Sequence, residues 1–89
     1  MILFKLKKFD SALRSWDDVI KLKPNNAEAY NNKGNILFLL EKYEAAIENF
    51  KEAIKIKPNY ADAYNNLGNP LWKQKKIDES LLSYKKAIV

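Results

Sequence analysis

The stretch AEAYNNKGN at residues 27–35 recurs as ADAYNNLGN at residues 61–69, a step of 34 residues. The tripeptide KPN at residues 23–25 recurs at the same step, at residues 57–59. A fixed period of this size is typical of a supersecondary unit that buries its apolar face only by stacking on neighbouring units. The repetition therefore predicts an array of stacked units.

Each unit carries the apolar pattern of two helices. In the first half of the unit, small or apolar residues recur at three- and four-residue steps, at Ala27, Tyr30, Gly34, Leu37 and Leu40. In the second half the same spacing occurs at Tyr43, Ala46, Ile47, Phe50, Ala53 and Ile54. Such spacing indicates one face of a helix, so the pattern predicts an all-α fold.

The prolines and asparagines between units predict where helices end and begin. Pro24 and Pro58 disfavour helical geometry in the residue before them. Asn25, Asn26 and Asn59 follow, and asparagine is a preferred N-cap residue. Each unit is therefore predicted to be a helical hairpin that begins after a proline.

These units resemble the tetratricopeptide repeat. The shared positions are an aromatic residue, a glycine, a leucine, a small residue, a second aromatic residue, an alanine and a closing proline. In the complete unit they are Tyr30, Gly34, Leu37, Ala46, Phe50, Ala53 and Pro58, and in the next unit Tyr64, Gly68, Leu71, Ser80, Tyr84 and Ala87. The resemblance spans nearly the whole chain and implies helical hairpins stacked as a right-handed α-solenoid.

The units are unequal in length. Residues 25–58 make one complete repeat, residues 59–89 make a repeat cut short within its second helix, and residues 1–24 supply mostly the second helix of another. Together they are predicted to form one domain that looks like a piece of a longer array. Because solenoids usually need about three repeats, we expect exposed apolar surface at both ends.

The composition argues against several classes of function. The chain has no cysteine and no histidine, which removes disulfides, thiolate zinc sites and the commonest catalytic base. The neighbouring acids Asp17-Asp18 and Asp78-Glu79 point apart on a helix, so neither pair predicts an active site. We therefore expect no enzyme, no cofactor and no metal.

Hydropathy and charge suggest a compartment and a class of partner. The longest apolar run, residues 36–40, is far shorter than the roughly 20 residues of a membrane span, and no signal peptide pattern opens the chain. An intracellular, cytoplasmic protein is expected. The net charge is +5, and Lys7, Lys8, Lys75 and Lys76 fall in the predicted turns within hairpins, where they could line one rim. Because arginine is almost absent and no dense basic stripe forms, nucleic-acid contact is only a remote alternative.

The resemblance also implies a binding surface. In this family the first helices of the repeats line a concave groove, and the groove positions here are Glu28, Asn31, Asn35, Phe38, Leu39, Asp62, Asn65, Asn69, Trp72 and Lys73. Asparagine both donates and accepts hydrogen bonds, which suits an extended peptide, while Phe38 and Trp72 offer apolar anchors. The alternative is that these aromatic residues pack within the array, and exposure of Trp72 distinguishes the two. The expected function is a protein-interaction module for a peptide or protein segment.

One activity found in such proteins is not expected here. Family members that grip the carboxylate tail of chaperones use basic residues on the first helices. Asn32 and Asn66 match a polar position beside that clamp, but the second position of each first helix is acidic, at Glu28 and Asp62. Tail capture is therefore not predicted.

Two departures from the family pattern favour self-association as an alternative function. Pro70 lies within a predicted first helix and is expected to kink or split it. The turns within the hairpins lack the usual glycine and read Lys7-Lys8, Glu41-Lys42 and Lys75-Lys76. If such a turn straightened, one helix of the hairpin could pack against a second molecule, as in a domain-swapped dimer. We predict that residues 2–22 form one nearly continuous helix and that the isolated chain is partly oligomeric.

Overall fold

A computed structural model describes the backbone of residues 2–88 and the side chains of residues 8–88. Within this range the chain forms five helices: α1 (Ile2–Leu22), α2 (Ala27–Leu39), α3 (Tyr43–Ile56), α4 (Ala61–Lys73) and α5 (Ile77–Ile88). No residue from 2 to 88 belongs to a strand. The predicted all-α fold is confirmed.

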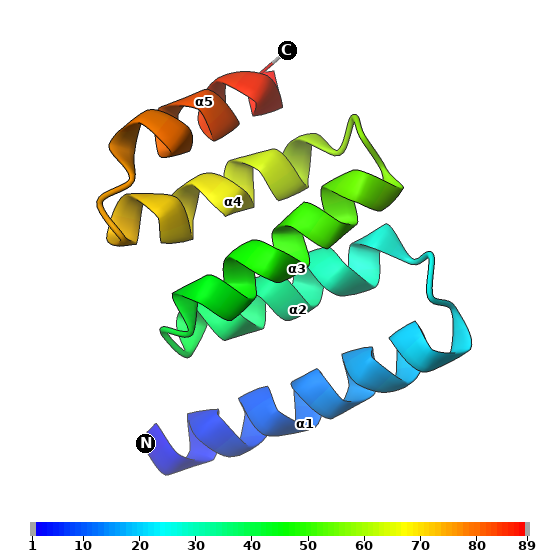
Figure 1. Cartoon of the computed structure of the whole chain (residues 1–89). Coiled ribbons are helices and arrows are strands. Elements are labelled where there is room, and N and C mark those ends of the chain that lie inside the picture. The colour runs from blue at the N-terminus through cyan, green and yellow to red at the C-terminus, as the bar shows by residue number, and fades with distance from the viewer. Residues whose placement is uncertain (1, 89) are drawn as a thin grey trace.

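The helices stack in the order of the sequence. Helix α2 packs against α3 and α4 packs against α5, so each pair forms a hairpin (Figure 1). Helix α3 packs against α4, α1 packs against α2, and the first helices α2 and α4 also touch. Contacts limited to near neighbours are the arrangement of a solenoid. The prediction of stacked helical hairpins is confirmed.

An aromatic ring on a glycine forms the centre of each hairpin. Phe50 of α3 is fully buried, and a Cβ atom at Gly34 of α2 would lie only 2.6 Å from its ring atom Cε1. In the second hairpin, a Cβ atom at Gly68 would lie 2.5 Å from the ring of Tyr84. Glycine is required at both positions because any side chain would overlap the ring.

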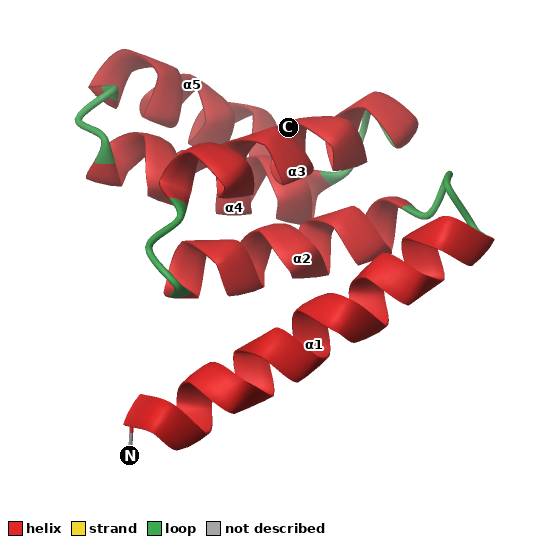
Figure 2. Cartoon of the chain, turned by 60° about the horizontal axis from the view of Figure 1, so that its bottom comes forward, coloured by secondary structure: helices red, strands yellow, loops and turns green. Residues whose placement is uncertain are grey.

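Helix α1 passes straight through the position of the first predicted turn. It runs without interruption from Ile2 to Leu22, as Figure 2 shows. The prediction of one continuous helix over residues 2–22 is confirmed. As a consequence Lys7 and Lys8 belong to a helix and not to a turn, so the predicted placement of these two lysines in a hairpin turn is wrong.

The two turns within the hairpins are closed by backbone geometry. Glu41 and Lys75 adopt left-handed conformations, with φ of 62° and 61°. The amide of Glu41 donates to the carbonyl of Phe38 and the amide of Lys42 donates to the carbonyl of Leu37, both at 2.9 Å. These two hydrogen bonds define a Schellman motif, in which glycine is the usual left-handed residue. A residue with a side chain costs about 1–2 kcal/mol in this conformation.

Helix α4 is not split at Pro70. It continues from Ala61 to Lys73, so of the two predicted effects of Pro70, a kink or a split, the split is wrong. Proline removes the hydrogen bond that position 70 would donate, but the ring of Pro70 is fully buried and its packing offsets part of that loss. Only the last turn of α4 lies after Pro70. Its helical hydrogen bond still forms, because the amide of Gln74 donates to the carbonyl of Pro70 at 3.0 Å.

The two first helices begin differently. Asn26 caps α2, since its side chain accepts a hydrogen bond from the amide of Ala29 at 3.1 Å, and this prediction is confirmed. Tyr60 occupies the cap position of α4 and makes no such bond. The prediction that Asn59 caps α4 is therefore wrong, because the chain enters the helix one residue later.

Candidate protein-binding surface

The first helices α2 and α4 are joined by a chain of polar side chains. The Nδ2 of Asn66 donates to Oδ1 of Asn31 at 3.1 Å, and the Nδ2 of Asn31 reaches the hydroxyl of Tyr60 at 3.5 Å. Asn31 is only 5% exposed. Its amide therefore connects α2 to α4 and to the turn before α4. The prediction had placed Asn31 on the surface of the groove instead.

The N-terminal ends of α2 and α4 form an acidic end of the surface. Burial raises the pKa of Tyr60, the nearby carboxylates of Glu28 and then Asp62 raise that pKa further, and the hydrogen bond from Asn31 lowers it. Both carboxylates therefore lie close enough to the same phenol to disfavour its ionised form. Glu28 and Asp62 are exposed, so their charges are available to a partner.

The C-terminal ends of the same helices carry exposed apolar groups and a cation. Leu39 is 60% exposed and Trp72 is 51% exposed. Lys73 is exposed beside Trp72. Half of the Trp72 side chain therefore lies outside the packing of the array. Its place in a binding surface stays a prediction.

Other predicted groove residues take part in the packing of the array. Phe38 is half-buried against the core, with its ring centroid 5.6 Å from that of Tyr43. Asn69 is half-buried and accepts a hydrogen bond from the hydroxyl of Tyr84 at 2.5 Å. Asn35 is half-buried, whereas Asn65 is exposed. The accessible set is thus concentrated at the two ends of the first helices.

The hydrogen bonds of several polar residues that support this surface were not predicted. Besides Tyr60 and Tyr84, they include Ser80, which is fully buried and donates from Oγ to the carbonyl of Gly68 at 2.8 Å. A signal exists in the sequence, because Tyr84 and Ser80 take the positions of Phe50 and Ala46 in the preceding repeat. A hydroxyl added at a buried position requires a partner.

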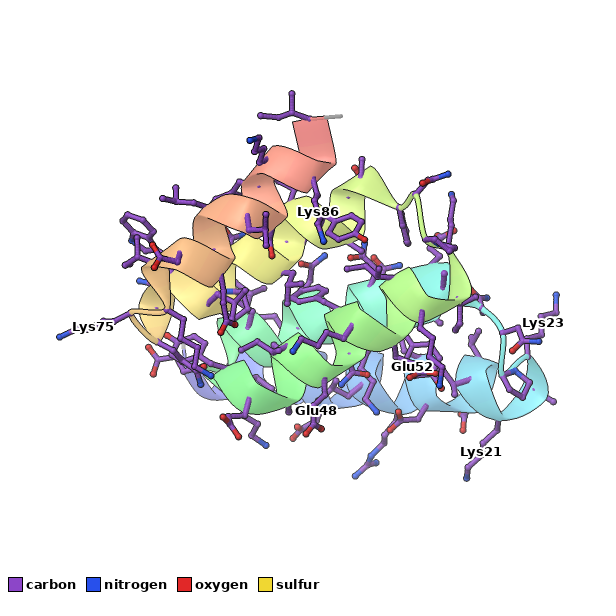
Figure 3. The ribbon with its side chains drawn as sticks, turned by 45° about the horizontal axis from the view of Figure 1, so that its top comes forward. Lys21, Lys23, Glu48, Glu52, Lys75 and Lys86 are labelled. Atoms are coloured by element: carbon purple, nitrogen blue, oxygen red, sulfur yellow. The ribbon has the colours of Figure 1, made fainter. Side chains whose placement is uncertain are left out.

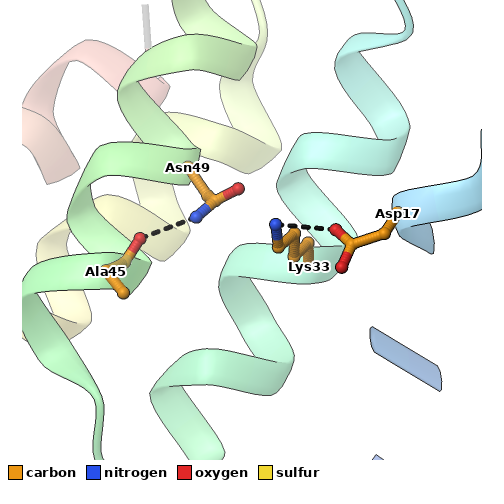
Figure 4. A network of polar contacts seen from close by, with 4 residues as sticks. All are labelled: Asp17, Lys33, Ala45 and Asn49. Atoms are coloured by element: carbon orange, nitrogen blue, oxygen red, sulfur yellow. Dashed lines mark hydrogen bonds and ion pairs between the residues drawn. The ribbon is translucent and has the colours of Figure 1, made fainter. Parts of the chain in front are cut away.

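An ion pair fixes α1 to α2 beside this surface. Figure 4 shows Nζ of Lys33 on α2 at 2.7 Å from a carboxylate oxygen of Asp17 on α1. In the same view the side chain of Asn49 bonds back to the carbonyl of Ala45 within α3, at 2.8 Å. The pair is partly exposed, so we expect it to orient α1 more than to stabilise the fold.

Some basic side chains lie at opposite ends of the molecule. Figure 3 shows Lys75 projecting from the α4–α5 turn at one end, whereas Lys21 and Lys23 lie at the other. Glu48 and Glu52 on α3 place negative charge between them (Figure 3). The side chain of Lys7 lies outside the described residues.

Neither a metal site nor a membrane span is present in the part of the chain that the structure describes. Among those residues, no three acidic side chains gather in a group that would hold a metal ion. None of the helices between residues 2 and 88 has the length and apolar character to cross a bilayer.

Comparison with known proteins identifies the family. The family described as TPR repeat matches residues 2–40 and, in a second overlapping match, residues 34–75. The chain therefore belongs to the tetratricopeptide repeat family, whose fold is a scaffold for protein interactions. A search of curated proteins found no match to this chain.

Solved structures share the fold. The crystal structure of MamA is similar with a TM-score of 0.87 and 27% identity, over 96% of this chain and 50% of that one. The second TPR of Spaghetti (RPAP3), bound to the HSP90 peptide SRMEEVD, has a TM-score of 0.88 and 22% identity, over 96% and 79% of the two chains. The first TPR of the same protein, with the same peptide, gives 0.89 and 24%, over 96% and 68%. The present chain spans about half the length of the MamA chain.

Proposed function

We propose that the protein is an interaction module that binds an extended peptide or protein segment along the surface of α2 and α4. The observation that carries the proposal is the 51% exposure of Trp72, a large side chain at a position that the family uses for ligands. Leu39 adds a second exposed apolar group on the neighbouring first helix. Aromatic residues in such positions commonly contribute most of the binding free energy.

The charges along this surface set the orientation in which a peptide would bind. Glu28 and Asp62 lie at the N-terminal ends of the two helices, and Trp72 and Lys73 lie at the C-terminal end. Asp62 and Trp72 are ten residues apart in one helix, a rise of about 15 Å, which an extended chain covers in about four or five residues. The segment that fits best therefore has a basic residue at one end and a large apolar residue about five positions away.

The similar folds solved with the HSP90 peptide support peptide binding by an array of this kind. Their peptide, SRMEEVD, is acidic toward its end. On the present chain the carboxylates of Glu28 and Asp62 would repel such a tail. We therefore expect a peptide of the opposite charge at that end of the surface.

Two peptides test this assignment. One carries arginine and leucine five positions apart in a neutral background, and the other has glutamate in place of the arginine. Fluorescence anisotropy is expected to show the arginine peptide binding at least about fivefold more tightly at low salt. Trp72→Ala is expected to weaken that binding by about 2 kcal/mol, or roughly thirtyfold.

The matched control is Leu22→Ala, which truncates an 83% exposed apolar residue at the end of α1, outside the helices α2 and α4. It should leave the affinity unchanged, and neither variant should alter the unfolding transition. Equal affinity for the two peptides, or equal loss in the two variants, would contradict the proposal.

Self-association is a second candidate function, favoured by the straight course of α1. In this helix the first turn is opened out, so residues 2–7 do not fold back on residues 10–22. An opened hairpin is the state that exchanges helices with a second copy.

Light scattering is expected to show a dimer whose share rises with concentration. Lys8→Pro, which interrupts α1 where the other repeats turn, should shift the population toward the monomer. A monomer at every concentration would contradict this candidate.

A further inference from the structure

The hydroxyl of Tyr84 on α5 distinguishes the second hairpin from the first. Both hairpins place an aromatic ring over a glycine, but the residue equivalent to Tyr84 in the first hairpin is Phe50, which has no hydroxyl. The hydroxyl of Tyr84 donates to Oδ1 of Asn69, the residue that follows Gly68 in α4. The equivalent residue Asn35 lacks this hydrogen bond, because a phenylalanine ring cannot donate one.

The length of this hydrogen bond fixes which end of the Asn69 amide faces Tyr84. The two oxygen atoms are 2.5 Å apart. O–H···O hydrogen bonds occur at this distance, whereas N–H···O hydrogen bonds begin at about 2.7 Å. A half-turn of the amide would bring Nδ2 to that place, at a distance too short for its hydrogen bond. Oδ1 therefore faces the hydroxyl, and Nδ2 faces away from it.

The two N–H groups on Nδ2 of Asn69 remain available to a ligand. Among the residues with described side chains, this Nδ2 makes no hydrogen bond, and the one polar side-chain atom buried without a partner is Oε1 of Gln74. Nδ2 is therefore in contact with solvent, although Asn69 as a whole is half-buried.

Asn69 also lies in the middle of the surface proposed for extended peptides. It follows Asp62 by seven residues and precedes Trp72 by three, and residues at these spacings share one face of a helix. A segment that reaches from the acidic end of α4 to Trp72 therefore passes over the amide of Asn69.

We propose that Tyr84 is a positioning residue of this peptide surface, which holds the amide of Asn69 so that N–H donors alone face the ligand. The group recognised there is a hydrogen-bond acceptor, a backbone carbonyl of the extended segment. Such a segment carries a carbonyl at every residue, so the contact does not depend on its side chains. The inference rests on the proposed function, because it concerns the same surface.

The orientation makes the two equivalent positions of the surface unequal. A free amide loses rotational freedom when it binds a ligand, whereas an amide that is already held loses less. Asn69 is held by Tyr84 before any ligand arrives. Asn35 is not held by a hydroxyl and can turn either its oxygen or its nitrogen to a ligand. Position 69 therefore selects an acceptor, and position 35 takes a donor or an acceptor.

A double-mutant cycle tests whether Tyr84 acts through Asn69. The probe is the arginine peptide described above, in an alanine background with both ends blocked, so that amide carbonyls are its only acceptors. Tyr84→Phe is expected to weaken binding about three- to tenfold, and Asn69→Ala by at least as much. In the Asn69→Ala protein the further change Tyr84→Phe should have no effect. Phenylalanine fits at this position, since Phe50 lies over Gly34 in the same way.

Reversing the hydrogen-bonding character of position 69 is the second test. Asn69→Asp keeps an acceptor for Tyr84 but presents a carboxylate oxygen to the ligand in place of the N–H donors. We expect it to weaken binding about tenfold, although the peptide is basic. The matched control is Asn65→Asp, which adds the same charge four residues earlier at an exposed position of α4 and should not weaken binding.

Nuclear magnetic resonance measures the mobility of the amide in the free protein. The side-chain Nδ2 of Asn69 is expected to have an order parameter of about 0.8, and that of Asn35 a value below about 0.6. Tyr84→Phe should lower the value at Asn69 to that of Asn35. A general loosening of the hairpin would lower the backbone values as well.

Three results would overturn the proposal. An equal effect of Tyr84→Phe with and without Asn69 would show that Tyr84 acts through packing. Equal order parameters at Asn69 and Asn35 would show that the amide is not held. Unchanged affinity in Asn69→Ala would show that Asn69 binds no carbonyl. A wild-type protein that binds no peptide would instead contradict the proposed function, and the order parameters would still support or overturn the fixed orientation of Asn69.

Discussion

Replacing Phe50 with alanine is expected to lower the free energy of unfolding by about 3–5 kcal/mol. The ring is fully buried and lies directly on Gly34, which has no side chain to fill the space that alanine would leave. It also belongs to the cluster that joins α2, α3 and α4. The stability of a stacked array depends on the interfaces between neighbouring units, so the loss extends beyond α3.

The matched control is Trp16→Ala, at the equivalent position of α1. Trp16 is larger but only half-buried, because α2 is the one described helix that packs against α1. We expect a loss of about 1–2 kcal/mol, less than half of the effect at Phe50. Urea unfolding followed by far-UV circular dichroism measures both, and equal losses would show that α1 is covered in solution.

Replacing Pro70 with alanine is expected to raise the free energy of unfolding by about 1–2 kcal/mol. Alanine restores the hydrogen bond to the carbonyl of Asn66 and removes a clash, together worth about 3 kcal/mol in a helix interior. Loss of the fully buried ring subtracts roughly 1–2 kcal/mol. The net effect remains stabilising because the first term is larger.

Pro58→Ala is the control for Pro70→Ala, and it should act in the opposite direction. Pro58 is exposed in the turn between repeats, where proline restricts the unfolded chain. Its loss is expected to cost about 0.4–1 kcal/mol. Thermal unfolding of the two variants gives the signs, and a destabilised Pro70→Ala protein would mean that the ring contributes more than the missing hydrogen bond removes.

Most of the fold could be predicted because a few residues in each repeat determine how its two helices pack. A glycine and an aromatic residue at fixed spacing, such as Gly34 and Phe50, specify both helices and their closest approach. The turns could not be predicted in the same way, since Glu41 and Lys75 are helix formers that become left-handed only when two helices are held side by side. The uninterrupted α4 has a similar cause, since the burial of Pro70 is a tertiary effect.

The candidate surface was predictable in outline and not in detail. Helical spacing assigns Asn31 and Trp72 to one face, but it does not say which side chain meets a neighbouring helix. The distance between α2 and α4 decides that Asn31 is bonded to Asn66, while Trp72, near the C-terminal end of α4, remains half exposed. Such differences depend on the positions of whole helices.

The straight course of α1 shows that the junction between the two helices of a repeat can adopt two states, a continuous helix or a left-handed turn. Position 7 in α1 and positions 41 and 75 in the hairpin turns are equivalent in the repeat, yet the first is helical and the others are left-handed. A left-handed residue costs about 1–2 kcal/mol, which only a sufficiently long preceding helix repays by packing. Lengthening the segment ahead of residue 7 with first-helix sequence should therefore fold this junction, whereas shortening the segment ahead of residue 41 should straighten the next one.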